Sequence, residues 1–162
     1  MLRRTVLLLS LSLLAACGFH LKGTGRHALH VEGGVRLVAV DVPEEAVQAV
    51  KEAFAHQNLT LDSKTARYVI RLRDFENSRF ESAIGGEHGQ SRAINLRKGF
   101  VASIEEGDKV LASQPLASET SINYHSEQYL GNLADDERAQ QALNRDNADK
   151  LLRFFQATVA QP

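Results

Sequence analysis

Residues 92–124 decide the fold, and they read RAINLRKGFVASIEEGDKVLASQPLASETSINY. In the first part of this stretch apolar residues recur at every second position, as they do in a strand with one buried face. The residues on this face are Ile94, Leu96, Phe100 and Ile104. The tetrad at 105–108, Glu-Glu-Gly-Asp, is typical of a hairpin turn. We therefore predict a strand over about 92–104 and a second strand from 109 to about 124.

Pro115 restricts where this second strand can lie. Proline has no backbone N–H to donate to a ladder, so it occurs on edge strands or at bulges. We expect an edge strand or a local bulge, with Val110 and Leu116 on one face of the strand.

Two further strands are predicted upstream. Tyr68, Ile70 and Leu72 alternate with Val69, Arg71 and Arg73, and the run 36–42 is short and rich in β-branched residues. Between them, Pro43 followed by two glutamates is typical of the first turn of a helix. Spacings of three and four between Val47, Val50 and Phe54 give this helix one apolar face, and Asn58 is expected to terminate it.

A long final helix is expected over about 133–158. Asn132 could cap it, and the acidic run 135–137 suits its first turn. Its apolar stripe consists of Ala142, Leu143, Ala148, Leu151, Leu152 and Phe155. The order β-α-β-β-β-α predicts an α+β two-layer sandwich. Its small four-stranded sheet is mostly antiparallel or mixed, with two helices on one face.

The first sixteen residues have the three parts of an export signal. Arg3 and Arg4 precede an apolar stretch over 6–14, and the segment closes on Leu-Ala-Ala before Cys17. The apolar stretch is shorter than the roughly 20 residues of a membrane span. Residues 17–34 contain five glycines and are expected to form a flexible tether. Residues 35–160 are then expected to form a single domain.

The motif at residues 14–17 resembles the bacterial lipobox. That resemblance implies a diacylglyceryl group on the Cys17 thiol, cleavage just before Cys17, and acylation of its new amine with a fatty acid such as palmitate. Gly18, where inner-membrane retention commonly uses Asp, suggests the outer membrane. With one cysteine in the chain, no internal disulfide is possible.

Composition and motifs exclude several function classes. Removing Arg3 and Arg4 from the 19 basic residues leaves 17 against 20 acidic ones, which argues against a nucleic-acid binder. The six histidines do not pair at the spacing of a helical metal site, and we expect no metal at His27 and His30, which share a glycine-rich segment. The glycine-rich run 84–89 lacks the Lys-Ser/Thr of a phosphate loop. We expect no enzyme, metal or cofactor. An envelope enzyme would need a grouping around His88 or His125.

Basic residues on the strands are the remaining candidates. If Ile70 and Leu72 face the helices, Arg71 and Arg73 face outward, and Arg97 does so by the same alternation. Such an outward face either serves solubility and discourages edge pairing, or binds anions, because arginine matches phosphate bidentately. Lys98 is expected near a rim or reaching out to solvent.

The run at residues 17–24, Cys-Gly-Phe-His-Leu-Lys-Gly-Thr, resembles the start of the mature lipopolysaccharide-assembly lipoproteins of Gram-negative outer membranes. The chain length, element order and acidic start of the last helix agree with that resemblance. It implies a lipid-anchored protein on the periplasmic side that plugs the lumen of the large lipopolysaccharide-assembly β-barrel. The protein would assist barrel assembly and bind lipopolysaccharide on its way to the cell surface.

The resemblance adds a ligand to the arginine face, because lipid A carries phosphates. Candidate contacts with lipopolysaccharide are Arg71, Arg73, Arg92 and Arg97. Family members carry basic residues before the third strand and near the start of the final helix; here only Arg92 and Arg138 lie nearby. An alternative is a stand-alone periplasmic lipoprotein that carries a lipid or small ligand in an enclosed apolar pocket between sheet and helices.

Overall fold

The computed structural model describes residues 31, 33–62, 64–84, 91–124 and 129–160. Its elements follow the predicted order β-α-β-β-β-α, and an α+β architecture is confirmed. They are β1 (Val35–Ala39), α2 (Glu44–Ala55), β2 (Tyr68–Ile84), β3 (Ser91–Glu106), β4 (Lys109–Tyr124) and α3 (Tyr129–Val159). The signal segment, Cys17 and most of the tether lie outside the described residues.

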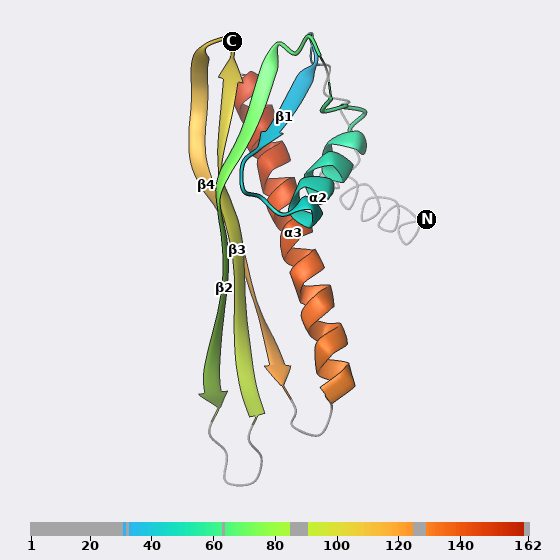
Figure 1. Ribbon diagram of the computed structural model, residues 1–162, viewed down its shortest axis with the longest axis vertical. Coiled ribbons are helices and arrows are strands. Elements are labelled where there is room, and N and C mark those ends of the chain that lie inside the picture. The colour runs from blue at the N-terminus through green and yellow to red at the C-terminus, as the bar shows by residue number, and fades with distance from the viewer. Residues whose placement is uncertain (1–30, 32, 63, 85–90, 125–128, 161–162) are drawn as a thin grey trace, which may run out of the picture.

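The four strands form one mixed sheet in the order β1-β2-β3-β4. β1 runs parallel to β2, and the other two ladders are antiparallel. Both helices lie on the same side of the sheet, as predicted (Figure 1). β4, which contains Pro115, is an edge strand, because the ladder hydrogen bond that proline lacks is not needed there.

β1 covers only the first part of β2. Its five residues pair with Tyr68–Leu72, and it ends at Ala39 rather than at the predicted residue 42. Asp41 adopts a positive φ of 54°, which turns the chain out of the sheet and into α2. The sheet thus has a four-stranded half next to β1 and a three-stranded half beyond it, where only α3 lies over the strands (Figure 1).

A β-bulge in β2 separates these two halves. Arg73 pairs with Val101, and the next pair joins Glu76 to Gly99, so β2 contains one extra residue at this point. Before the bulge, even-numbered side chains of β2 such as Ile70 face the helices. Beyond it, odd-numbered ones do, because Arg79 pairs with the buried Leu96.

Two hydrophobic clusters of unequal size lie between sheet and helices. The larger one fills the four-stranded half. It contains Val35, Val50, Phe54, Leu61, Tyr68, Ile70, Leu72, Phe100, Ala102, Ile104, Leu116, Ala148, Leu151, Leu152 and Phe155. The Phe155 ring lies 5.6 Å from that of Phe54 and 6.0 Å from that of Tyr68, measured between centroids. The smaller cluster, in the three-stranded half, contains Ile94, Leu96 and Leu143.

A layer of buried polar groups separates the two clusters. Asn147 on α3 donates from Nδ2 to the carbonyl of Lys98 at 2.9 Å, and its Oδ1 lies 2.6 Å from Ser118 Oγ. Lys150 donates to Ser118 Oγ at 2.8 Å and to the Ala117 carbonyl at 2.7 Å. We call Lys98, Ser118, Asn147 and Lys150 the polar belt. It satisfies backbone and side-chain groups that would otherwise be buried without partners.

Lys98 is not at a rim, as predicted, but buried at 5% exposure on the helix-facing side of β3. This burial lowers the pKa of its ammonium by desolvation, and the carboxylates of Glu45 on α2 and Asp136 on α3 partly offset the effect. The helices close over a position that alternation alone places on the buried face.

Two further local predictions were wrong. α3 begins at Tyr129, so Asn132 lies inside the helix and is buried instead of capping it. Val110 does not share the face of Leu116, because the register of β3 and β4 shifts between Ile104 and Glu105. Val110 is therefore 56% exposed, whereas Leu116 belongs to the large cluster.

Within the described part of the chain, no helix combines the length and apolarity needed to cross a membrane.

Candidate functional site

The face of the sheet opposite the helices is the candidate site, and we call it the outer face. No helix or strand of the described residues covers it (Figure 1). Arg71 and Arg73 on β2 and Arg97 on β3 project from this face, as the alternation of the strands predicted. Each of the three contacts a carboxylate, and these pairs differ in geometry.

Arg71 forms a two-pronged ion pair with Glu105 of β3. Its Nε lies 2.9 Å from Glu105 Oε1, and its Nη2 lies 3.1 Å from Oε2. Ser103 donates to the same carboxylate at 3.2 Å. The hydrogen bonds from Arg71 are the main cause that lowers the pKa of Glu105, and Glu105 in turn raises the pKa of Arg71.

Arg73 has a weaker arrangement. It pairs at 2.8 Å with Asp74, the next residue in the chain, and both side chains are more than half exposed. An exposed pair of this kind contributes little to stability and exchanges readily with solvent ions. Among the described residues, the ion pair of Arg73 is thus with its chain neighbour at the bulge.

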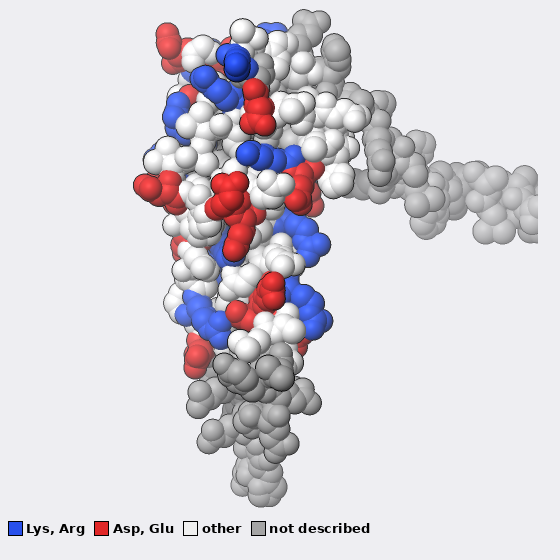
Figure 2. Space-filling model, turned by 45° about the vertical axis from the view of Figure 1, so that its right-hand side comes forward, with Lys and Arg blue, Asp and Glu red and all other residues white. Residues whose placement is uncertain are grey.

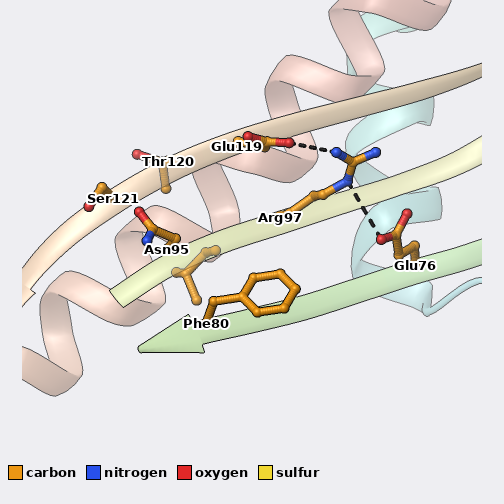
Figure 3. A pocket seen from close by; sticks show the side chains of 8 residues that line it. Glu76, Phe80, Asn95, Arg97, Glu119, Thr120 and Ser121 are labelled. Atoms are coloured by element: carbon orange, nitrogen blue, oxygen red, sulfur yellow. Dashed lines mark hydrogen bonds and ion pairs between the residues drawn. The ribbon is translucent and has the colours of Figure 1, made fainter. Parts of the chain in front are cut away.

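Arg97 lies between two glutamates from the neighbouring strands (Figure 3). Its Nη1 is 2.6 Å from Glu119 on β4, and its Nε is 3.6 Å from Glu76 on β2. That Nε is shielded from solvent and makes no hydrogen bond. The guanidinium thus has two negative neighbours, and its Nε forms an ion pair with Glu76 without a hydrogen bond.

A hollow of about 500 Å³ surrounds Arg97 on the outer face of the three-stranded half. It is lined by Glu76, Phe80, Asn95, Leu96, Arg97, Glu119, Thr120 and Ser121. Phe80 is 61% exposed and lies beside the polar side chains in Figure 3. The hollow therefore offers one apolar ring next to guanidinium, carboxylate, amide and hydroxyl groups.

The charges around these arginines are balanced rather than basic. Arg71, Arg73 and Arg97 each have a carboxylate within 3 Å, so an anion must compete with Glu105, Asp74 or Glu119 for their N–H groups. Figure 2, which shows another side of the molecule, likewise has blue and red side chains interspersed without a single basic patch. Only ligands that bring further contacts besides phosphate fit such a face well.

The other predicted site residues are only partly described. Arg92 belongs to β3 and pairs through its backbone with Ala83 and Tyr124, but its side chain lies outside the described part. Cys17, His88 and His125 lie outside it altogether. Within the described residues, no three His, Cys, Asp or Glu side chains gather as metal ligands would.

Sequence reasoning missed Phe80, and it also missed the polar residues that line the hollow beside it, Glu76, Asn95, Glu119, Thr120 and Ser121. Phe80 lies beyond the bulge, where the simple alternation that identified 68–73 changes phase. The available signal was a single aromatic residue within the polar run 76–82, Glu-Asn-Ser-Arg-Phe-Glu-Ser. A large apolar side chain among polar neighbours is typical of a binding surface when it is exposed.

Large apolar side chains occupy the space between the sheet and the helices in the four-stranded half. Phe54, Phe155 and Leu151 are fully buried there and fill the four-stranded half. A second hollow, of about 420 Å³, lies between α2 and α3 and is lined mainly by glutamates, glutamines and an asparagine. Neither hollow resembles the enclosed apolar pocket that a stand-alone lipid carrier requires.

No family model and no curated protein matches this chain. Solved structures do share its fold. A minor lipoprotein from Acinetobacter baumannii has a TM-score of 0.62 at 18% identity, over 82% of this chain and 98% of its own. The rare lipoprotein B from Shewanella oneidensis has 0.60 at 18% identity, over 77% and 95%. An uncharacterized lipoprotein B from Nitrosomonas europaea has 0.69 at 16% identity, over 89% and 94%. At these identities the likeness establishes a common fold, which is the fold of proteins named as lipoproteins.

Proposed function

We propose that this chain is an outer-membrane lipoprotein that plugs and assists assembly of the lipopolysaccharide-translocating β-barrel and binds lipopolysaccharide during its transport. The observation that carries the proposal is the combination of a lipobox cysteine, Cys17, with a domain whose fold recurs in solved lipoproteins. In this role the protein is a binding partner and has no catalytic step of its own.

The anchor follows from the number of acyl chains. One chain holds a protein to a bilayer only marginally, whereas two or more give stable attachment. Three chains on Cys17 would keep the domain at the periplasmic side of the outer membrane. From there the domain would enter the barrel lumen, and residues 18–30 would supply the reach.

The outer face supports lipopolysaccharide as the ligand through its mixed chemistry. Lipid A joins phosphates to a sugar backbone and acyl chains, so it can offer contacts to arginine, to polar side chains and to apolar groups at once. Arg97 supplies a partly exposed guanidinium, and Phe80 supplies exposed apolar area in the same hollow. Phosphate would replace Glu119 or Glu105 on an arginine while the rest of the ligand adds binding energy.

Binding of purified lipopolysaccharide at physiological salt tests this assignment. The triple variant Arg71→Gln, Arg73→Gln, Arg97→Gln should weaken binding about ten-fold, because three charge-assisted contacts are lost. Glutamine avoids placing a new carboxylate beside Glu105 and Glu119. The matched control replaces three exposed arginines of α3, Arg138, Arg145 and Arg153, with glutamine.

The two triple variants must differ for the assignment to stand. Circular dichroism of both verifies that the fold is intact. Equal binding by wild type and the outer-face variant would refute a role for this face. An equal loss of binding in both variants would show that net charge, and not the outer face, determines binding.

The barrel partnership has a separate test. Full-length protein extracted from outer membranes in mild detergent should co-purify with a β-barrel protein of several hundred residues. Recovery of the lipoprotein without such a partner, also after cross-linking in intact cells, would contradict the plug function whatever the result with lipopolysaccharide.

A further inference from the structure

β2 has an open edge in the three-stranded half of the sheet. β1 pairs with Tyr68–Leu72 only, and from Glu76 to Ile84 the sole partner of β2 among the described residues is β3. Along these nine residues, every second one directs its N–H and C=O groups to a side where no described strand lies. Such an edge is a template for another strand.

The opposite edge of the sheet is obstructed by comparison. Pro115 in the middle of β4 has no N–H to donate. Two residues further on, the Ala117 carbonyl already accepts a hydrogen bond of 2.7 Å from Lys150 of α3. A strand that approached β4 would meet a missing donor and an occupied acceptor, so the β2 edge is the more available one.

The sequence of the open edge is complementary to itself. Phe80 is its central residue, with four residues on either side. If a second copy pairs antiparallel about a two-fold axis at this residue, Phe80 faces Phe80 of the copy. Arg79 then faces Glu81 of the copy, and Glu81 faces Arg79. Aromatic pairs and opposite charges directly across a ladder are the favourable combinations.

The neighbouring registers lack this complementarity. A two-fold axis at residue 79 would place Arg79 against Arg79, and an axis at residue 81 would place Glu81 against Glu81. Like charges directly opposite each other are destabilising. The charge pattern therefore selects the register centred on Phe80 over both of its neighbours.

We propose that two copies of this chain associate through the β2 edge, Glu76–Ile84, in antiparallel register about Phe80. The pairing joins two sheets into one of eight strands and covers the exposed Phe80 rings against each other on the outer face. Arg79 keeps its 2.9 Å contact with Asp136 of its own chain, and Glu81 of the copy becomes a second acidic neighbour. This self-association goes beyond the proposed function and does not depend on it, although a chain paired at this edge does not offer Phe80 to lipopolysaccharide at the same time.

The interface is small and the dimer is accordingly weak in solution. A nine-residue strand pair lies below the size of stable interfaces, so micromolar or weaker association is expected. Chains anchored to one membrane surface meet at a much higher effective concentration, which favours a weak contact of this kind.

Sedimentation of the full chain in detergent, over a concentration series up to about 1 mM, measures the association. Wild type should show a monomer–dimer equilibrium, and Phe80→Lys should weaken it at least ten-fold. Val110→Lys is the matched control, because Val110 is a similarly exposed apolar residue at the start of β4, away from the β2 edge. That control should dimerise like wild type.

A charge exchange tests the register itself. Glu81→Arg should weaken the dimer, because Arg79 of each copy then faces the arginine introduced in the other. Adding Arg79→Glu to the same chain should restore it, although that second change removes the contact with Asp136. Only a cross-strand pairing of these two positions predicts this rescue.

Each result decides the proposal. A chain that stays monomeric throughout, equal behaviour of Phe80→Lys and Val110→Lys, or failure of the charge exchange to rescue would overturn it. A photo-cross-linker at position 80 in intact cells should capture a second copy; capture of a different protein instead would assign this edge to that protein and overturn self-pairing. If Phe80→Lys does not fold, as judged by circular dichroism, the charge exchange decides.

Discussion

The two halves of the sheet are built from the same long strands but are stabilised differently. The four-stranded half has both helices above it and fifteen buried residues in one cluster. The three-stranded half has only the first part of α3 and a cluster of three. The long strands and α3 run through both halves, so they connect the thinly packed three-stranded half to the well-packed four-stranded half. The thinly packed half is also the one that carries the open β2 edge and the hollow at Phe80.

The largest expected difference between the halves comes from two leucines on α3. Leu151 is buried in the large cluster and Leu143 in the small one. We expect Leu151→Ala to cost about 4 kcal/mol of unfolding free energy and Leu143→Ala about 2 kcal/mol, because the smaller cluster can collapse into the cavity. Urea denaturation of both variants gives the two values. Equal losses would mean that the two clusters are equally well packed.

The next prediction concerns the polar belt that joins the halves. Asn147→Ala should cost about 2 kcal/mol, because the buried Lys98 carbonyl and Ser118 hydroxyl lose a partner. Asn123→Ala, at an exposed position of β4, is the control and should change stability by less than about 0.5 kcal/mol. Denaturation midpoints compare them. A neutral Asn147→Ala would show that the belt separates the clusters without stabilising their junction.

Lys98 provides a prediction of opposite sign. Its folded-state pKa is lowered by desolvation, so the unfolded state binds the proton more readily and wild-type stability rises as pH increases toward the ordinary value of 10.5. Lys98→Met should therefore raise stability by about 1 kcal/mol at pH 7. The gain should shrink as pH rises toward that value. A destabilised variant at pH 7 would instead indicate that Glu45 and Asp136 outweigh the cost of burial.

The smallest effect is expected at Glu105. Its pKa is lowered in the folded state, so its contribution is present above the ordinary value of 4.5 and disappears as pH falls through the folded-state value. Glu105→Gln should lower Tm by less than about 2 °C at pH 7 and make unfolding less sensitive to acid. Thermal scans at pH 7 and pH 3 measure both. Unchanged acid sensitivity would mean that the pair with Arg71 is not maintained in solution.

Local pattern predicted much of this fold, because strand and helix periods are properties of neighbouring residues. The hairpin of β3 and β4 and the apolar face of α2 follow from spacing, and the edge position of β4 is one of the two alternatives that Pro115 left open. The continuation of β2 past Arg73 and the burial of Lys98 are two of the features that local pattern did not predict. The first depends on a bulge that changes the phase of alternation, and the second on which helices close over that strand position.

The sequence predicted which face of the sheet the arginines of the candidate site occupy, but not the carboxylates that neutralise them. Period two placed Arg71, Arg73 and Arg97 on the outer face. Glu105 and Glu119 neutralise two of them from other strands, and such contacts depend on the register between strands rather than on the sequence of one strand. For the same reason the meeting of Phe80 with Arg97 in one hollow could not be anticipated.

The bulge in β2 decides which face of the sheet each later side chain of this strand occupies. One extra residue between Arg73 and Glu76 inverts which face every later side chain of β2 occupies. Deleting that residue would turn Phe80 toward α3 and Arg79 toward the outer face, although neither had been mutated. Related chains should therefore be compared through this point only after the bulge has been matched, since a gap elsewhere would exchange the two faces of the sheet.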